Sequence, residues 1–291
     1  MPEAKIGVIG GSGLYQMEGM TDREEVQVMT PFGAPSDAIT VGRVEGVSIA
    51  FLPRHGRGHR LNPTEVPSRA NIYALKSLGV EWVISVSAVG SMREDIAPLD
   101  LLIPDQLFDR TKSRVNSFFE GGLVVHCSFA DPFCPTLSGI LWDAAQELAD
   151  VKVHRGGTYI CIEGPLFSTK AESRIYRQWG VDVIGMTALP EAKLAREAEM
   201  CYATIACATD YDVWHETAGA VTVEMVIGNL MKNVANAQRI IRAVARRIPA
   251  DRAQNTCECP SALASAIITD RGRIPAEALE KYHLLVGRYL R

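Results

Sequence analysis

The stretch that decides the fold is IGVIGGSG, residues 6–13. Its first half is β-branched and apolar, which is typical of a strand covered on both faces. Glycines follow at once, and because they lack a Cβ the backbone can approach an anion closely, with the Ser12 hydroxyl as an additional donor. The third glycine of the dinucleotide fingerprint is missing, which argues against a dinucleotide site. The pattern predicts the first strand of an α/β sheet, followed by a phosphate-binding loop or a plain tight turn.

Strand-like and helix-like segments alternate through the rest of the chain. This alternation predicts an α/β fold, a single domain with a central mixed β-sheet flanked by helices. We assign residues 1–250 to this domain, and expect 251–291 to be a C-terminal extension packed on the same domain or on a neighbouring subunit. The apolar patterns predict strands at 38–41, 47–52, 82–86, 101–103, 158–162, 182–184 and 202–208. Helices are expected at 67–78, 137–148, 168–179 (with Ser168 as N-cap), 190–200, 222–248 and 275–290.

The composition limits the classes of function. With 291 residues, of which 47% are hydrophobic and 22% charged, the chain can bury a large core. A net charge of −4 argues against nucleic acid as a partner, but local arginines can still bind a small anion. No apolar run is long enough for a membrane span, and the N-terminus lacks the basic start of a signal peptide. Seven scattered cysteines fit a reducing, cytoplasmic compartment.

Two polar segments at strand ends are candidates for binding and catalysis. PRHGRGHR (53–60) offers arginines that suit an oxyanion, while its glycines disfavour a helical zinc pair, so we expect no metal. TDYDVW (209–214) places Asp210 and Asp212 after a strand, where one carboxyl could be protonated and the other ionised. Each segment alone is also explained by a solvated basic turn or by turn-forming aspartates.

Eight segments, in order, resemble the trimeric purine nucleoside phosphorylases, and among them those that act on 5′-methylthioadenosine. The resemblance spans roughly residues 5–248. The segments are IGVIGGSGL (6–14), TPFGAPSD (30–37), PRHGRGH (53–59), SVSAVGS (85–91), DQLFDRT (105–111), EGPLFS (163–168), GMT (185–187) and ATDYD (208–212).

The resemblance implies a phosphorolysis. Inorganic phosphate and 5′-methylthioadenosine would give adenine and 5-methylthio-α-D-ribose 1-phosphate, in purine and methionine salvage, with phosphate as co-substrate and no cofactor. A homotrimer, or a pair of such trimers, is also implied. Three alternatives stay open: a phosphorylase for 5′-methylthioinosine, other purine nucleosides or also 5′-deoxyadenosine; a nucleosidase that uses water; and a nucleotide-binding module without activity.

The resemblance also implies roles for individual residues. The catalytic residues would be Asp210, Asp212, Arg54 and His55. The phosphate would be bound by Ser12, Arg54, His55, Ser87, Ala88 and Thr187. The nucleoside would be contacted by Phe167, Ser168, Met186, Asp210, Asp212, Val223, Val226, Ile227 and, from a neighbouring subunit, His126.

The chain departs from the family pattern at a few positions. Gly185 replaces a usual Asn and Leu166 a usual basic residue, which puts local loop geometry in doubt. The pair Cys257 and Cys259 resembles a tail that forms disulfides in some thermostable relatives. A reducing compartment instead favours two reduced thiols in a surface loop.

Overall fold

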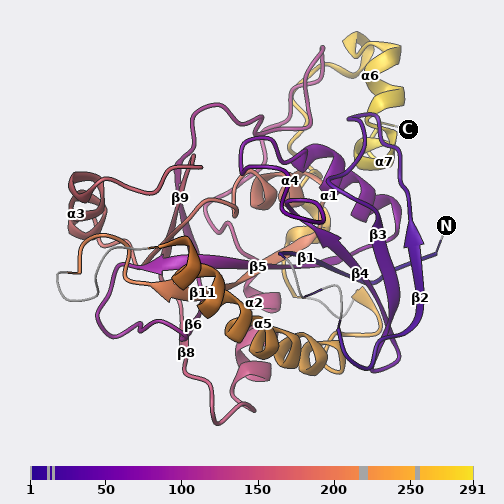
Figure 1. Ribbon diagram of the computed structural model, residues 1–291. Helices are drawn as coiled ribbons and strands as arrows, with labels where there is room; N and C mark the ends of the chain where they lie inside the picture. The colour runs from indigo at the N-terminus through magenta and orange to yellow at the C-terminus, as the bar shows by residue number, and fades with distance from the viewer. Residues whose placement is uncertain (1, 12–13, 15–16, 216–221, 253–255, 291) are drawn as a thin grey trace.

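The computed structural model describes residues 2–11, 14, 17–215, 222–252 and 256–290 (Figure 1). One mixed sheet runs through the protein in the order β2-β3-β4-β1-β5-β10-β9-β7, and a branch of β11, β6 and β8 starts from β5. The strands are β1 (Ile6–Gly10), β2 (Thr21–Val26), β3 (Ile39–Val44), β4 (Val47–Pro53), β5 (Trp82–Ser91), β6 (Leu101–Ile103), β7 (Gln106–Arg110), β8 (Val153–Arg155), β9 (Thr158–Ile162), β10 (Val183–Gly185) and β11 (Cys201–Asp210).

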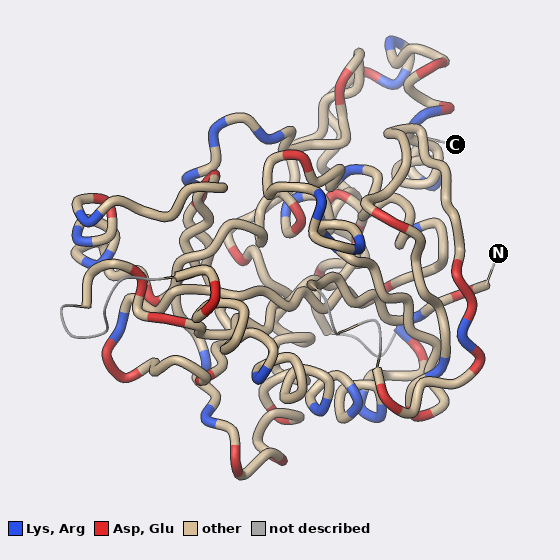
Figure 2. Tube along the Cα trace, viewed as in Figure 1, with Lys and Arg blue, Asp and Glu red and all other residues tan. Residues whose placement is uncertain are grey.

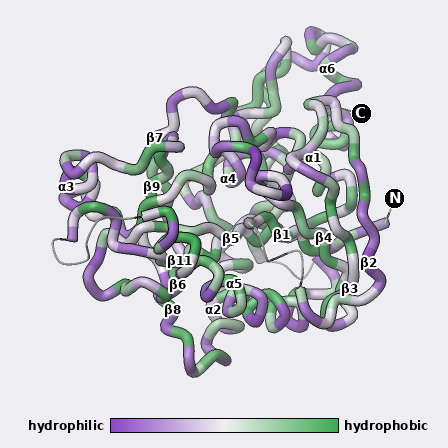
Figure 3. The backbone as a smooth tube through the Cα atoms, in the orientation of Figure 1, coloured by the Kyte–Doolittle hydropathy of each residue, from purple (hydrophilic) through white to green (hydrophobic). Residues whose placement is uncertain are grey.

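Helices cover both faces of this sheet. Residues on β1 alternate between two cores: Val8 packs with α2 and α5, whereas Ile9 packs with α1 and α4. Figure 3 shows the central strands as mainly hydrophobic. Figure 2 shows Lys and Arg along the outer side of α5, where Arg239 pairs with Asp150 at 2.8 Å. The helices are α1 (Ser68–Ser77), α2 (Pro135–Ala145), α3 (Lys170–Gln178), α4 (Glu191–Glu197), α5 (Val223–Ala245), α6 (Ala276–Lys281) and α7 (His283–Val286).

The pairing of four strands determines where a site can form. β1 runs parallel to β4 and to β5, and β5 runs parallel to β11. Their carboxyl ends therefore meet at one edge of the sheet, which is where open α/β sheets bind ligands. Gly10 at the end of β1, Arg54 after β4 and Asp210 at the end of β11 all lie at this edge.

Some local expectations were wrong. β2, β7 and β8 were not expected, and β2 is a polar edge strand with five exposed residues, so it has no apolar alternation to detect. The helix expected at 275–290 is divided into α6 and α7. The N-cap of α3 is Thr169, which forms a capping box with Glu172, and not Ser168.

The C-terminal segment packs on the main body. Tyr282, Leu285 and Val286 are buried in the same core as α1 and α4, and Figure 1 shows α6 and α7 beside that face. Within the described parts of the chain, no helix combines the length and apolarity needed to cross a bilayer.

Candidate active site

A cavity of about 530 Å³ opens at the carboxyl edge of the sheet. Almost all of the residues that the sequence singled out line it, although they come from segments far apart in the chain. Ser12 lies outside the described residues, and His126 is exposed and is not among the lining residues. The predicted residues in the wall are Arg54, His55, Ser87, Ala88, Phe167, Ser168, Met186, Thr187, Asp210, Asp212, Val223, Val226 and Ile227.

Several polar atoms in this wall are buried without a partner. The hydroxyls of Ser87, Ser168 and Thr187 and the Oδ2 atom of Asp212 have no hydrogen bond to any residue that the structure describes. Buried polar atoms are nearly always paired in proteins, because each one left unpaired costs roughly 1–3 kcal/mol. Four such atoms around one cavity indicate a polar ligand.

Arg54 is buried, and most of its donors are already used inside the protein. Its Nε bonds Glu191 at 2.5 Å and its Nη2 bonds the other oxygen of the same carboxylate at 3.0 Å. Burial acts to lower the pKa of Arg54, but the Glu191 carboxylate outweighs it and leaves that pKa raised. Nη1 carries two N–H groups and donates one to the Val86 carbonyl at 2.9 Å, so a second can point to a ligand.

His55 is neutral near pH 7. Burial, reinforced by the Arg54 guanidinium, lowers the pKa of His55 to about 4. Its Nδ1 lies 2.9 Å from the Leu61 carbonyl, which can only accept, so Nδ1 carries the proton and Nε2 is an acceptor. Its ring stacks on His59 at 4.3 Å, and His59 also lines the cavity. The sequence analysis did not assign a role to His59.

Asp210 and Asp212 line the same cavity. Burial raises the pKa of both carboxyl groups, so each holds its proton to a higher pH than usual. Asp210 Oδ1 accepts from the Asp212 backbone N–H at 2.7 Å, and Oδ2 lies 2.7 Å from the Thr209 hydroxyl. That hydroxyl also lies 3.2 Å from the Val89 carbonyl. If the Thr209 hydroxyl donates its one hydrogen to the Val89 carbonyl, it can only accept from Asp210, and the Asp210 carboxyl group must then be protonated.

Two asparagines that the sequence analysis missed connect α5 to the end of β11. Asn229 Nδ2 donates to the Thr209 carbonyl at 2.7 Å, and Asn233 Nδ2 donates to the Ala208 carbonyl at 3.1 Å. Their spacing of four residues puts both on one face of the helix, and Asn233 is fully buried. Polar residues within the apolar stripe of a helix are the sequence signal that could have indicated these contacts. These amides fix the first turns of α5 relative to Asp210.

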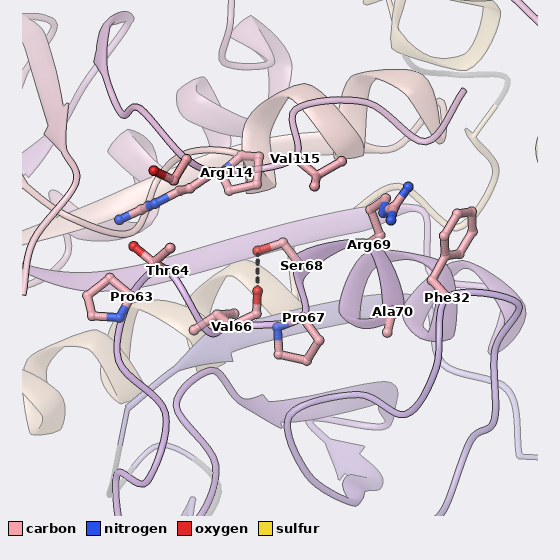
Figure 4. A pocket seen from close by; sticks show the side chains of 12 residues that line it. Phe32, Pro63, Thr64, Val66, Pro67, Ser68, Arg69, Ala70, Arg114 and Val115 are labelled. Carbon is pink, nitrogen blue, oxygen red and sulfur yellow. Dashed lines mark hydrogen bonds between the residues drawn. The ribbon is translucent and has the colours of Figure 1, made fainter. Parts of the chain in front are cut away.

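Arg114 was also missed by the sequence analysis. It binds the backbone of two loops of the site, those at Met186 and at Glu163. Its guanidinium donates to the carbonyls of Met186 and Glu163, each at 2.6 Å. It lines a second cavity of about 200 Å³, which shares Pro63 with the main one, and Figure 4 shows it above Pro63 and Thr64. Arg114 therefore positions the loop that carries Met186 and Thr187.

The departure at Gly185 has a structural cause. A Cβ built on Gly185 would lie 2.1 Å from the Tyr159 hydroxyl, so Tyr159 fills the space that a larger residue would need. Burial raises the pKa of Tyr159 to about 12, while the hydroxyls of Ser87 and Thr187 oppose this shift. Tyr159 thus keeps its proton and lies next to two of the hydroxyls without partners.

The remaining wall is apolar and incompletely covered. Val223 and Ile227, in the first turns of α5, are 58% and 54% exposed, and Phe167, which also lines the cavity, is 48% exposed. Large apolar side chains at this exposure are typical of a surface that binds a ligand or another chain.

The pair Cys257 and Cys259 differs from the expectation of a surface loop. Cys259 is buried and Cys257 is half-buried, and both pack in the core beside α2 and α5. Neither residue lines the cavity.

Comparisons with known proteins agree with this geometry. Residues 5–246 match the model of the phosphorylase superfamily. The S-methyl-5′-thioadenosine phosphorylase of Geobacter sulfurreducens is 60% identical over 289 residues, covering 99% of this chain and 100% of its own. That of Chloroflexus aurantiacus is 58% identical over 290 residues, covering 99% of each.

Solved structures give the same result. A methylthioadenosine phosphorylase from an Antarctic soil metagenomic library superimposes with a TM-score of 0.93 at 50% identity, covering 98% of this chain and 99% of its own. The Schistosoma mansoni methylthioadenosine phosphorylase, in complex with adenine, gives 0.81 at 37% identity, covering 86% and 93%. The chain belongs to the S-methyl-5′-thioadenosine phosphorylase family within the phosphorylase superfamily.

Proposed function

We propose that this protein catalyses phosphorolysis of 5′-methylthioadenosine to adenine and 5-methylthio-α-D-ribose 1-phosphate, as a step in purine and methionine salvage. One observation carries the proposal. The same cavity is lined by Arg54 and hydroxyls without partners, and also by a buried carboxyl group with a raised pKa. An anionic nucleophile and a basic leaving group need these two environments.

In this mechanism Ser87, Thr187, the backbone at Ala88 and one Nη1–H of Arg54 bind phosphate, with Ser12 as a further expected donor. Because Glu191 already neutralises Arg54, these groups act mainly as hydrogen-bond donors. His55 Nε2 accepts from a phosphate hydroxyl. A phosphate oxygen forms the bond to C1′ while the electrons of the C1′–N9 bond pass to the purine. Met186 contacts the ribose, which lies between the phosphate and the purine.

Asp210 completes the reaction by protonating the leaving base. As the C1′–N9 bond breaks, negative charge develops on the purine, and a proton donated from Asp210 to N7 relieves it. Asp212 assists, and Phe167 and Ser168 contact the base. Once it has given up its proton, the Asp210 carboxylate accepts a hydrogen bond from the 6-amino group of adenine. A 6-oxo group has no hydrogen to donate there, so its oxygen would face the carboxylate oxygen, which is also an acceptor. This mismatch, worth roughly 1–3 kcal/mol, favours adenine nucleosides about ten- to a hundredfold.

The 5′ end of the substrate would meet the apolar part of the wall. Val223, Val226 and Ile227 have no hydrogen-bonding side chains, so they favour a methylthio group over a 5′-hydroxyl, which would lose its bonds to water. The half-exposed state of Val223 and Ile227 in the single chain supports a homotrimer in which a neighbour closes this end. His126 is exposed, as a residue offered to a neighbouring site must be. The odd, scattered set of cysteines supports a cytoplasmic location.

The decisive experiment is the dependence of adenine release on phosphate. Purified protein, freed of phosphate by dialysis, should release adenine from 5′-methylthioadenosine only when phosphate is added, with one methylthioribose 1-phosphate formed per adenine. Turnover undiminished without phosphate would instead identify a nucleosidase. A kcat/KM higher for 5′-methylthioinosine than for 5′-methylthioadenosine would refute the role given to Asp210.

Subunit mixing tests the shared site. His126→Ala and Asp210→Asn chains should each have low activity alone. When the two are unfolded and refolded together, about a quarter of the sites in a randomly mixed oligomer combine an intact Asp210 with an intact neighbouring His126. Activity should rise to about that fraction of the wild-type value. No gain above the separate variants would refute the contribution of His126 from a neighbouring subunit.

A further inference from the structure

Four cysteines that are far apart in the chain bring their sulfur atoms together outside the active site. The Sγ atoms of Cys134, Cys201, Cys257 and Cys259 all lie within 4.8 Å of one another, and those of Cys201 and Cys257 are 3.5 Å apart. They lie in the core between the sheet and α2, and none lines the active-site cavity. Three of the four are buried and Cys257 is half-buried.

The spacing of these sulfurs fits a metal ion better than it fits covalent pairs. A tetrahedral Zn²⁺ with Zn–S bonds of about 2.3 Å holds its four sulfurs about 3.8 Å apart, so each needs to move by only about 1 Å or less. A disulfide needs a separation of about 2.05 Å within each pair and no closeness between the pairs. Here all four sulfurs are mutually close, which is the arrangement of a tetrathiolate site.

The surrounding elements hold the four ligands in place. Cys134 is the N-cap of α2, and its Sγ accepts from the Leu137 N–H at 3.4 Å, which fixes the position of this sulfur at the start of the helix. Cys201 is the first residue of β11, and Cys257 and Cys259 lie in the C-terminal segment, where Cys259 begins a short 3-10 turn (Cys259–Ser261). With four protein sulfurs and little access for solvent, no position is open for a substrate, so the site would be structural.

We propose that Cys134, Cys201, Cys257 and Cys259 bind one Zn²⁺ ion, which fastens the C-terminal segment to β11 and α2. Binding displaces the thiol protons to solvent and requires no oxidant. This proposal revises the expectation of no metal, and it does not depend on the reaction proposed above. Because metal bound only by the folded chain adds its binding free energy to stability, the site would act as a non-covalent cross-link.

Zinc analysis of the full-length protein tests the proposal. Protein purified without metal-affinity resin or chelator should contain about one zinc per chain by plasma mass spectrometry, and X-ray absorption at the zinc edge should report four sulfurs at about 2.3 Å. Cys257→Ser should lower the zinc content at least about tenfold. Cys127→Ser is the matched control, because Cys127 is also half-buried but lies outside the cluster, and it should keep the wild-type content.

The wild-type protein alone can refute the proposal, so the test does not depend on a variant that folds. Metal-free protein with all seven thiols titratable after unfolding would overturn it. Metal-free protein whose intact mass shows two disulfides would also overturn it, as would iron in place of zinc. Chelation should lower Tm, and added Zn²⁺, but not Mg²⁺, should restore it. A Tm unaffected by removal of bound zinc would overturn the proposed cross-link.

Discussion

Replacing Asp210 by Asn should abolish most of the activity and leave the fold intact. The substitution changes one carboxyl oxygen to an amide nitrogen and keeps the shape of the side chain. Oδ1 can still accept from the Asp212 N–H at 2.7 Å. The new Nδ2 can donate to the Thr209 hydroxyl, which then donates to the Val89 carbonyl, 3.2 Å away. Asn thus reproduces the hydrogen bonds of the protonated acid but has no proton to transfer.

The size of the loss follows from this chemistry. A positioned general acid contributes about a hundredfold to ten-thousandfold, or about 2.7–5.5 kcal/mol of the barrier. The loss should appear in kcat, because the shape and polarity around the purine are preserved. Stability should not fall. Burial raises the pKa of Asp210, so the wild-type carboxyl stabilises the fold at low pH, and this contribution is lost as pH rises through the folded pKa. Asn has no such loss.

Steady-state kinetics and thermal unfolding between pH 5 and 8 measure both effects. Asp210→Asn should lose at least about a hundredfold in kcat, and its Tm should fall less than that of the wild type as pH rises. Asp150→Asn is the matched control, since this exposed carboxylate pairs with Arg239 on α5. It should leave kcat unchanged. Wild-type kcat in Asp210→Asn would remove Asp210 from the mechanism, and a large fall in its Tm would refute the proposed hydrogen-bond exchange.

Three further predictions concern the wall of the cavity. The kcat/KM of the wild type should fall as pH rises through the raised pKa values of Asp210 and Asp212, since the acid form is consumed; a pH profile that rises over the same range would contradict this. Gly185→Ala should lower the free energy of unfolding by about 1–3 kcal/mol in denaturant titrations, because the new Cβ would lie 2.1 Å from the Tyr159 hydroxyl. Adding Tyr159→Phe should recover part of this loss, whereas strictly additive effects of the two substitutions on the free energy of unfolding would contradict the contact. Ile227→Ala should reduce the preference for 5′-methylthioadenosine over adenosine, as ratios of kcat/KM, by about tenfold, and an unchanged ratio would exclude Ile227 from the 5′ subsite.

The central part of the fold could be predicted because its signals are local. β1, β5 and β11 are almost entirely buried and mostly apolar, and buried strands of this kind differ from helices in their length and β-branching. The polar edge strand β2 has no such signal, because it is held in the sheet by hydrogen bonds to β3 rather than by burial of apolar side chains. The tail was read as one helix, since its apolar spacing continues across Tyr282, where the chain divides into two.

The site shows the same division between local and distant information. Arg54 and Asp210 were found because each follows a strand that carries its own pattern. Glu191 and Arg114 act through partners more than 45 residues away, and no local pattern reports such a contact. The cysteine cluster depends on three distant segments in the same way, so only Cys257 and Cys259 were noticed, and their environment was wrong.

The two asparagine amides between α5 and β11 have a consequence for the length of substrate that fits. In the proposed binding mode, one end of the nucleoside meets the carboxyl group on β11 and the other meets the start of α5. Asn229 and Asn233 join α5 to β11 directly through their hydrogen bonds to the Thr209 and Ala208 carbonyls. These hydrogen bonds therefore fix the distance between the Asp210 carboxyl group and the start of α5. A bulkier 5′ group cannot be accommodated by sliding the helix outward, because the helix would pull the strand end, and the acid with it, away from N7. Substrates that are too long should thus be penalised in turnover as well as in binding.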